Sequence, residues 1–506
     1  MAIPERAKSS LWSGVILRRR QLSDGSAYTP SFGVPESPDS NILRDSLRLR
    51  VFAVKEPYSA FTAKTQRREE RIRIFFGTTP LGFRLSRKTE DQAMPTSRRQ
   101  FCEYLASCGL SAAFAPLGAG GATQDSARAA APTGSHIGNL YDFAQQQADS
   151  SPVRFSFLRS EFGDLERWQV VARARVFDHL FYFPPVVWPE PKILRRKDRG
   201  DYVEEYLTFQ TAPGVRVPAY VLIPKKARLP APGIVALHCH GGYYLWGKEK
   251  VVELDEEHPA LSRFKQELYE GKSIASELAR QGYVVITIDM FYWGERRMLL
   301  DDDPPAYRER PRSMTDAEIR AFNRRSSENE QLVARSLFTA GITWPGVLLW
   351  DDIRTVDYLA SRPEVDKTRL ACVGLSVGGY RSFALAALDP RIKAAVDVGW
   401  MTSYPHQIKR HVINSIGFTF HIIGLYRYLD FPDLAALIAP RAVLVINGSK
   451  DQLFAPDGVR AAFEKIRRCY EKAGAPERQR CSLYPAPHEF NLKMQEEAWE
   501  WLKRWV

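Results

Sequence analysis

The sequence predicts an α/β protein with a mostly parallel, twisted sheet covered by helices on both faces. Strand-like and helix-like segments alternate repeatedly after residue 230, which is the pattern of parallel strands joined by helical crossovers. Two strand-like runs precede that alternation and are separated by Pro213-Gly214, which predicts an antiparallel pair at the start of the sheet. The 506 residues, 44% of them hydrophobic, are enough for a full-sized enzyme core.

The expected elements follow in order along the chain. Residues 133–200 are expected to be a helical N-terminal segment, and 201–506 the catalytic domain. The antiparallel pair spans 202–209 and 215–223. Further strands are expected at 234–239, 283–288, 369–375, 393–398, 442–447 and 482–484, and helices at 273–280, 347–361, 378–388, 457–473 and 491–506. The helix at 347–361, for example, places its apolar residues on one face.

Two long insertions interrupt this rhythm, at 299–345 and 400–440. Insertions of this length in an α/β domain usually lie over the site as lids or pocket walls. The first one contains the acidic run Asp301-Asp302-Asp303. This run could bind a cation, but a solvated loop or helix-capping cluster is favoured.

The first 132 residues are expected to lie outside the folded enzyme. Residues 1–93 are rich in Arg and Ser without any period, and we expect a disordered extension or a spurious start of translation. Residues 94–132 place Arg98-Arg99 before an apolar, small-residue stretch and end in small residues, as a secretory signal does. The paired arginines resemble the twin-arginine export signal. We therefore expect the twin-arginine export machinery as a partner and a periplasmic or extracellular location.

Charge and hydropathy exclude two other classes of protein. The net charge of +12 would suit nucleic acid, but residues 1–93 hold 17 Lys and Arg against 10 Asp and Glu, and only +4 remains on residues 133–506. We therefore expect no nucleic-acid partner. No run of 18 apolar residues occurs, so no stable membrane span is expected. Cys239 and Cys372 lie in apolar runs and should be buried thiols, whereas a Cys469–Cys481 bridge stays open.

One motif in the alternating region carries chemistry. Gly374-Leu375-Ser376-Val377-Gly378 joins an expected strand to an expected helix. A nucleophile on such a sharp turn needs glycines around it, because a Cβ there would meet the neighbouring strand or helix. The turn points the helix N-terminus at the oxyanion that develops during acyl transfer. Ser376 is therefore the predicted nucleophile, and the backbone N–H of Val377 is the predicted first oxyanion donor.

Two further residues complete a catalytic triad. Asp451 follows the strand at 442–447, and His488 lies between the last strand and the last helix. The chain order Ser376, Asp451, His488 is that of the α/β-hydrolase fold. Asp457 competes for the role of the acid, but it follows Pro456 at an expected helix start and would support that helix N-terminus instead. We therefore favour Asp451.

The run His238-Cys239-His240-Gly241-Gly242 ends the strand at 234–239. Histidine and cysteine together could suggest zinc, but the sequence contains no second ligand cluster. The favoured interpretation is a turn that supplies a second oxyanion amide near Gly242. We expect neither a metal ion nor a cofactor.

From these motifs the chain resembles the dienelactone-hydrolase and acetyl-xylan-esterase-like branch of the α/β-hydrolases. The resemblance spans about residues 165–506. It rests on His240-Gly241-Gly242, Asp289-Met290-Phe291-Tyr292-Trp293-Gly294-Glu295-Arg296, the Ser376 motif, Ala439-Pro440-Arg441, Asp451 and His488. The nucleophile is Ser rather than the Cys of dienelactone hydrolase, which counts against dienelactone as the substrate. The resemblance implies ester hydrolysis, and the substrate it suggests is an acetylated carbohydrate.

The predicted function is that of an exported serine esterase that forms an acyl-enzyme on Ser376. Trp293, Trp400 and Tyr243 could form a stacking surface for a sugar, although core packing is at least as good an interpretation for each.

Two alternative functions remain. A serine peptidase related to prolyl oligopeptidases would need a large propeller, for which too few residues precede the sheet. A non-catalytic binding protein on the same fold would have a broken triad, and this triad is intact.

Overall fold

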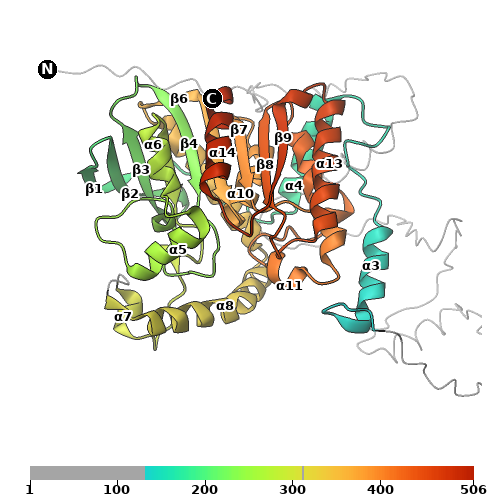
Figure 1. Ribbon diagram of the computed structural model, residues 1–506, viewed down its shortest axis with the longest axis horizontal. Coiled ribbons are helices and arrows are strands. Elements are labelled where there is room, and N and C mark those ends of the chain that lie inside the picture. The colour runs from blue at the N-terminus through green and yellow to red at the C-terminus, as the bar shows by residue number, and fades with distance from the viewer. Residues whose placement is uncertain (1–131, 310–312) are drawn as a thin grey trace, which may run out of the picture. The chain divides into compact units, whose positions relative to one another are not determined.

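In the part of the chain that the structure describes, nine strands form one sheet, in the order β1-β2-β3-β5-β4-β6-β7-β8-β9 (Figure 1). The computed structural model describes residues 132–309 and 313–506. The strands are β1 (Lys192–Asp198), β2 (Tyr202–Ala212), β3 (Val215–Pro224), β4 (Ala231–Leu237), β5 (Val284–Ile288), β6 (Val365–Leu375), β7 (Ile392–Val398), β8 (Ala442–Gly448) and β9 (Gln479–Tyr484). Pairing is antiparallel from β1 to β5 and parallel from β5 through β4 to β9. The predicted fold class is confirmed.

Helices pack along the sheet as the alternation predicts. They are α3 (Tyr141–Asp149), α4 (Leu165–Asp178), α5 (Pro259–Tyr269), α6 (Ile274–Arg280), α7 (Pro305–Arg308), α8 (Asp316–Thr339), α9 (Trp344–Ser361), α10 (Val377–Leu388), α11 (Val412–Ser415), α12 (Ala435–Ile438), α13 (Pro456–Lys472) and α14 (Leu492–Trp505). Helices α4, α9 and α12 pack around α10, while α6 and α14 lie in front of the sheet in Figure 1.

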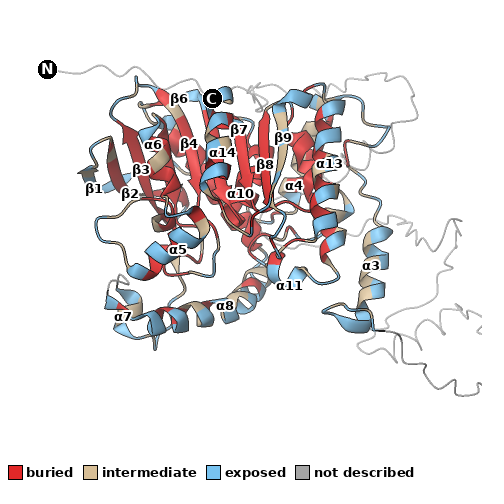
Figure 2. Cartoon of the chain, in the orientation of Figure 1, coloured by how far each residue is buried: buried red, intermediate tan, exposed pale blue. Residues whose placement is uncertain are grey.

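The middle strands are buried because helices cover them (Figure 2). All five residues of β5, Val-Val-Ile-Thr-Ile, are buried, and β8 is buried from Ala442 to Asn447. Such continuous apolar runs are typical of parallel strands with both faces covered. Cys239 and Cys372 are buried thiols in this core, as predicted, and Cys469 and Cys481 are free rather than bridged.

The expectation of a helical segment over 133–200 is wrong at its end, where the chain forms the edge strand β1. Its sequence, Lys-Ile-Leu-Arg-Arg-Lys-Asp, has no apolar alternation because neither face of the strand is buried, and its pairing with β2 is supported by ion pairs. Arg195 contacts Glu204 at 2.9 Å and Arg196 contacts Glu205 at 3.7 Å. Charged side chains on an edge strand also discourage pairing with other chains. Helix α4, within the same segment, joins the hydrophobic core of the sheet.

Helices α7 and α8 of the first predicted insertion and α11 of the second lie beyond one end of the sheet (Figure 1), whereas α12 of the second insertion packs against α10. Helix α8 begins with a capping box in which Thr315 and Glu318 exchange hydrogen bonds. In the acidic run before it, Asp303 pairs with Arg325 of α8, whereas Asp301 is exposed, so the run supports the helix.

Within the described residues no single helix has the length and apolar composition of a membrane span. Helices α8 and α9 meet this criterion only when they are taken together, and a bend of 82° separates them. The predictions for residues 1–93 and for the export signal at 94–132 fall outside the described residues, apart from residue 132.

Candidate active site

Ser376 occupies a strained turn between β6 and α10. Its backbone angles are φ 59° and ψ −124°, a left-handed conformation that costs a non-glycine residue energy and is typically retained for function. A Cβ at Gly378 would collide with the carbonyl oxygen of Leu237 in β4, and a Cβ at Gly374 would meet the same oxygen. The Ser376 N–H donates to the Val398 carbonyl oxygen at 2.7 Å, which fixes the turn to the neighbouring strand. The glycines are therefore needed where the motif places them.

Asp451 and His488 lie together, although 37 residues separate them. Backbone hydrogen bonds between the loops after β8 and β9, from Lys450 to Ala486 among others, bring the two residues into contact. His488 Nδ1 lies 2.6 Å from Asp451 Oδ2, and the Leu453 N–H donates to the other Asp451 oxygen at 2.9 Å. The carboxylate is 1% exposed and the imidazole 21% exposed. Such a carboxylate holds a histidine in one tautomer and leaves Nε2 for proton transfer.

The competing acid, Asp457, does not reach the histidine. Its side chain is 76% exposed in the first turn of α13, where it pairs with Arg460. It has the role at a helix N-terminus that the sequence indicates for it.

Ser376 and His488 line one cavity of about 340 Å³, which lies between the sheet and the two insertions. Trp400, at the end of β7, and Leu453, beside Asp451, are also part of its wall. Residues of both insertions line it: Ser327 and Glu330 from α8, and Ile413, Asn414, Ser415, Gly417, Thr419 and Phe420 from the second insertion. The expectation that the insertions form pocket walls is confirmed.

Two backbone amides were predicted to form the oxyanion hole, and they differ in whether a hydrogen-bond acceptor within the protein already contacts them. Val377 is the first residue of α10, where an amide has no partner within its own helix. The Gly242 N–H instead donates to His240 Nδ1 at 3.0 Å. Gly241 and Gly242 have φ values of 57° and 67° and both line the cavity. The Gly242 amide is therefore at the predicted place, but it has an acceptor within the protein.

The histidines at the end of β4 do not form one ligand set. His238 is buried, its Nδ1 lies 3.0 Å from the Cys239 carbonyl oxygen, and its Nε2 accepts the Met290 N–H at 3.2 Å. Burial holds the pKa of His238 well below its usual range. His240 instead lies in the catalytic cavity, where its Nε2 is 2.8 Å from Glu330 Oε1. Sequence reasoning missed Glu330, which gives no local signal within a highly charged helix.

The motif from Asp289 to Arg296 forms a network of buried charges with Lys248. The Asp289 carboxylate is buried, and it accepts from the Lys248 ammonium at 2.8 Å and from the Glu295 N–H at 3.0 Å. Burial raises the pKa of Asp289 to about 6, and the surrounding carboxylates hold the pKa of Lys248 well above its usual range. A Cβ at Gly294 would meet the Asp289 carboxylate, so that glycine is required.

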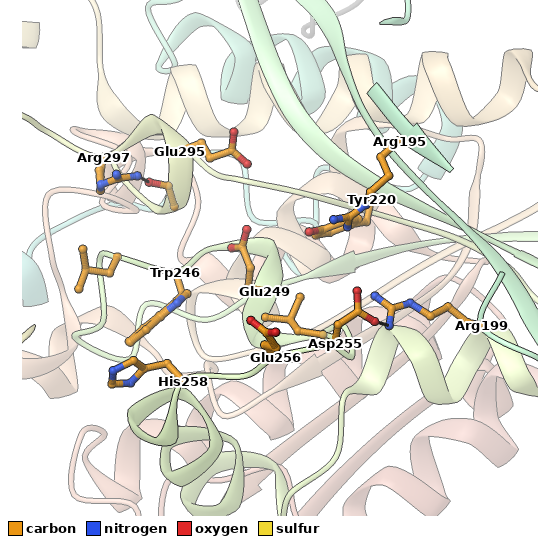
Figure 3. A pocket seen from close by; sticks show the side chains of 13 residues that line it. Arg195, Arg199, Tyr220, Trp246, Glu249, Asp255, Glu256, His258, Glu295 and Arg297 are labelled. Atoms are coloured by element: carbon orange, nitrogen blue, oxygen red, sulfur yellow. Dashed lines mark hydrogen bonds and ion pairs between the residues drawn. The ribbon is translucent and has the colours of Figure 1, made fainter. Parts of the chain in front are cut away.

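A second cavity adjoins this network (Figure 3). In the described residues, Glu249, Asp289 and Glu295 place carboxylate oxygens within 4.8 Å of one another, as metal ligands would. Lys248 Nζ lies 2.9 Å from Glu249 and 2.8 Å from Glu295, so a lysine ammonium occupies the centre of the group. The guanidinium of Arg199, on the opposite wall, pairs with Glu204 at 2.8 Å. The charges of this cavity are thus largely neutralised by neighbouring side chains.

The three aromatic residues considered for sugar stacking have different surroundings. Trp400 lines the catalytic cavity and packs edge-on against Phe420, with ring centroids 5.2 Å apart. Trp293 is fully buried behind His240, and the Tyr243 ring stacks on Trp246 at 5.8 Å. Of the three, Trp400 is the one in a position to contact a substrate.

Known proteins are similar to this chain over the same region. YtaP of Bacillus subtilis (strain 168), named provisionally as a hydrolase, is 26% identical over 313 residues, which cover 62% of this chain and 91% of that protein. A Bacteroides fragilis NCTC 9343 structure named provisionally as an acetyl xylan esterase is similar in fold, with a TM-score of 0.52 and 20% identity over 68% of this chain and 82% of that one. A glucuronoyl esterase from Solibacter usitatus has a TM-score of 0.46 and 15% identity over 69% and 96% of the two chains. The sequence also matches the Abhydrolase family over residues 143–307 and 310–500, and the chain therefore belongs to that family.

Proposed function

We propose that the protein is a serine esterase that hydrolyses a carboxylic ester, with an acetylated carbohydrate as its substrate class. The observation that carries the proposal is the hydrogen bond of 2.6 Å between Asp451 and His488, together with Ser376 on its strained turn in the same cavity. This is the arrangement in which a serine, a base and an orienting acid act as one unit.

In this mechanism the Ser376 oxygen attacks the ester carbonyl while its proton passes to Nε2 of His488. The Val377 amide stabilises the negative oxygen of the tetrahedral intermediate, and Asp451 stabilises the imidazolium. The intermediate collapses, the C–O bond to the alcohol breaks, and the alcohol leaves with the proton from His488. Water then attacks the acyl-enzyme by the same route, which releases the acid and restores Ser376.

Ser376→Ala tests the proposal directly. The variant should fold normally and lose ester turnover by roughly three to six orders of magnitude, because the nucleophile is gone. Turnover is measured on p-nitrophenyl acetate, on acetylated xylosides and on prolyl peptides, and folding by circular dichroism and thermal melting. Ester hydrolysis near the wild-type rate in the variant would refute the mechanism. Preference for the prolyl peptides would transfer the protein to the peptidase class.

We also propose that the protein is exported through the twin-arginine machinery, on the basis of Arg98-Arg99 and the apolar stretch after it. In a host with that machinery, replacing both arginines by lysine should keep the protein in the cytoplasm. A chain that begins at Pro132 should fold and hydrolyse esters as the full chain does. Export despite the double replacement would contradict the signal, and an inactive shortened chain would contradict the proposed boundary.

A further inference from the structure

A second histidine–carboxylate pair lies in the catalytic cavity and has no part in the mechanism above. His240 Nδ1 accepts the Gly242 N–H, so the ring proton resides on Nε2, which donates to Glu330 Oε1 at 2.8 Å. The hydroxyl of Tyr244 donates to the same oxygen, also at 2.8 Å. Both contacts hold one oxygen of the Glu330 carboxylate in a fixed position.

The other carboxylate oxygen of Glu330 is left for a ligand. In the described part of the chain no donor contacts Oε2, and the side chain is 16% exposed where it lines the cavity. An ionised carboxylate only accepts hydrogen bonds, so this oxygen is suited to a hydroxyl or amine donor. Because two donors already hold the Glu330 carboxylate in place, this side chain loses little conformational entropy when a ligand binds to Oε2.

The rest of the cavity wall limits what that donor belongs to. Among the described residues that line the cavity there is no lysine or arginine, and Glu330 supplies the one carboxylate. An anionic substrate would therefore be repelled rather than paired. Ser327 and Asn414 add neutral hydrogen-bonding groups, and Trp400 and Phe454 add aromatic surface. A neutral ring that carries several hydroxyls and one apolar face matches this mixture.

We propose that Glu330 is a specificity-determining residue whose Oε2 accepts a hydrogen bond from a free hydroxyl of a neutral polyhydroxy ester, such as a partly O-acetylated sugar. This inference rests on the esterase function proposed for Ser376. Helix α8 thereby supplies substrate recognition, while the sheet supplies the chemistry.

Glu330→Gln tests the inference, because glutamine keeps the length of the side chain and an oxygen for His240. Glu328→Gln, an exposed neighbour on the same helix, is the matched control for the loss of charge. For a mono-acetylated methyl xyloside, Glu330→Gln should lower kcat/KM by roughly 10- to 100-fold, mainly through KM, which is the range for a hydrogen bond to a charged group. For p-nitrophenyl acetate, which has no hydroxyl, the change should stay within about 3-fold, and Glu328→Gln should change neither.

Deoxy analogues of the acetylated xyloside identify the hydroxyl. One analogue should cost the wild type the same factor as the substitution and cost Glu330→Gln nothing more, as expected for two groups that act through one contact. If kcat/KM fell equally on both esters, Glu330 would act only by holding His240 in place. If kcat/KM on the xyloside did not fall, Glu330 would not contact the substrate. Either result overturns the inference. Failure of the wild type on p-nitrophenyl acetate would instead reject the esterase proposal itself.

Discussion

Replacing Lys250 by methionine would test how the loop after β4 is held in place. The Lys250 side chain is buried, and its ammonium donates to the carbonyl oxygens of Cys239 at 3.0 Å and His240 at 2.8 Å. It also lies over the Phe264 ring, 5.3 Å from the centroid. No carboxylate among the described residues forms an ion pair with it. A buried ammonium whose acceptors are two loop carbonyls is well placed to position the amides that follow them.

The stability change can be estimated from two opposing terms. Burial lowers the pKa of Lys250 from 10.5 to about 8, which corresponds to a penalty of about 3.4 kcal/mol for the charged form. The two hydrogen bonds to carbonyls contribute about 1.5–3 kcal/mol each. Because the terms are similar, Lys250→Met should change the free energy of unfolding at pH 7 by less than about 3 kcal/mol. The loop, in contrast, loses its anchor.

Activity is therefore the sensitive readout. We expect kcat on p-nitrophenyl acetate to fall by roughly 10- to 100-fold, because the released loop lines the cavity that holds Ser376 and a small displacement there misplaces the substrate. Lys265→Met is the control, because Lys265 is also buried but pairs with Glu257 and donates to the Val252 carbonyl oxygen at 2.7 Å and to Ser273 at 3.1 Å, away from the loop. Wild-type activity in Lys250→Met, or an equal loss in Lys265→Met, would refute the reasoning.

The pH dependence of stability gives a second check on Lys250. Its pKa in the folded protein, about 8, is lower than the 10.5 of the unfolded chain, so the unfolded chain binds more protons between these values. The penalty is present at neutral pH and disappears as the pH rises. Relative to Lys250→Met, the wild type should gain about 2 kcal/mol of unfolding free energy between pH 7.5 and pH 10 in urea titrations. A constant difference would mean that the ammonium is not penalised by burial.

Three further predictions concern the site and its support. Asp451→Asn should lower kcat by roughly 10³- to 10⁴-fold and Asp457→Asn by less than about 3-fold, since only Asp451 contacts the histidine; the reverse ranking would reassign the acid. Gly378→Ala should destabilise the fold by more than about 3 kcal/mol in thermal or urea unfolding, because its Cβ meets a β4 carbonyl, whereas Gly163→Ala, in open space, should not. The pKa of His238 is held well below 6.5 in the folded protein, so below pH 6.5 the unfolded chain binds a proton that the native state does not bind. The unfolding free energy of the wild type should therefore fall by about 1.4 kcal/mol per pH unit as the pH decreases in this range. The unfolding free energy of His238→Gln should depend less steeply on pH in the same range.

The sequence was sufficient for the middle of the sheet and for the placement of Asp451 beside His488, at the cavity that Ser376 also lines. Apolar runs mark strands such as β5 and β8 because both of their faces are covered, and chain order places Asp451 and His488 at neighbouring strand ends. It was not sufficient for β1, whose charged residues pair across strands and leave no period to detect. Burial leaves a pattern in the sequence, whereas an edge strand stabilised by ion pairs does not.

The same reason explains why Glu330 was missed. Its partner His240 lies 90 residues away, and nothing in a helix rich in charge distinguishes a carboxylate that faces a cavity from one that faces water. The role of Gly242 was predicted from its place after β4. In the structure its N–H donates to the side chain of His240, two residues earlier, and its φ is 67°. A glycine allows this φ but does not by itself predict it.

Buried and half-buried side chains hold the backbone of the loop after β4. Ser376 is fixed to β7 by its own N–H, and the loop that carries His488 is joined to the loop after β8 by backbone hydrogen bonds. The loop after β4 has two consecutive left-handed glycines and no ladder beyond Leu237, so its shape depends on side chains that hold its backbone. Lys250 binds its carbonyls and His240 binds its amide. Because His240 is held in turn by Glu330 of α8, the residue proposed to recognise the substrate and the loop after β4 meet at one histidine that lines the same cavity as Ser376.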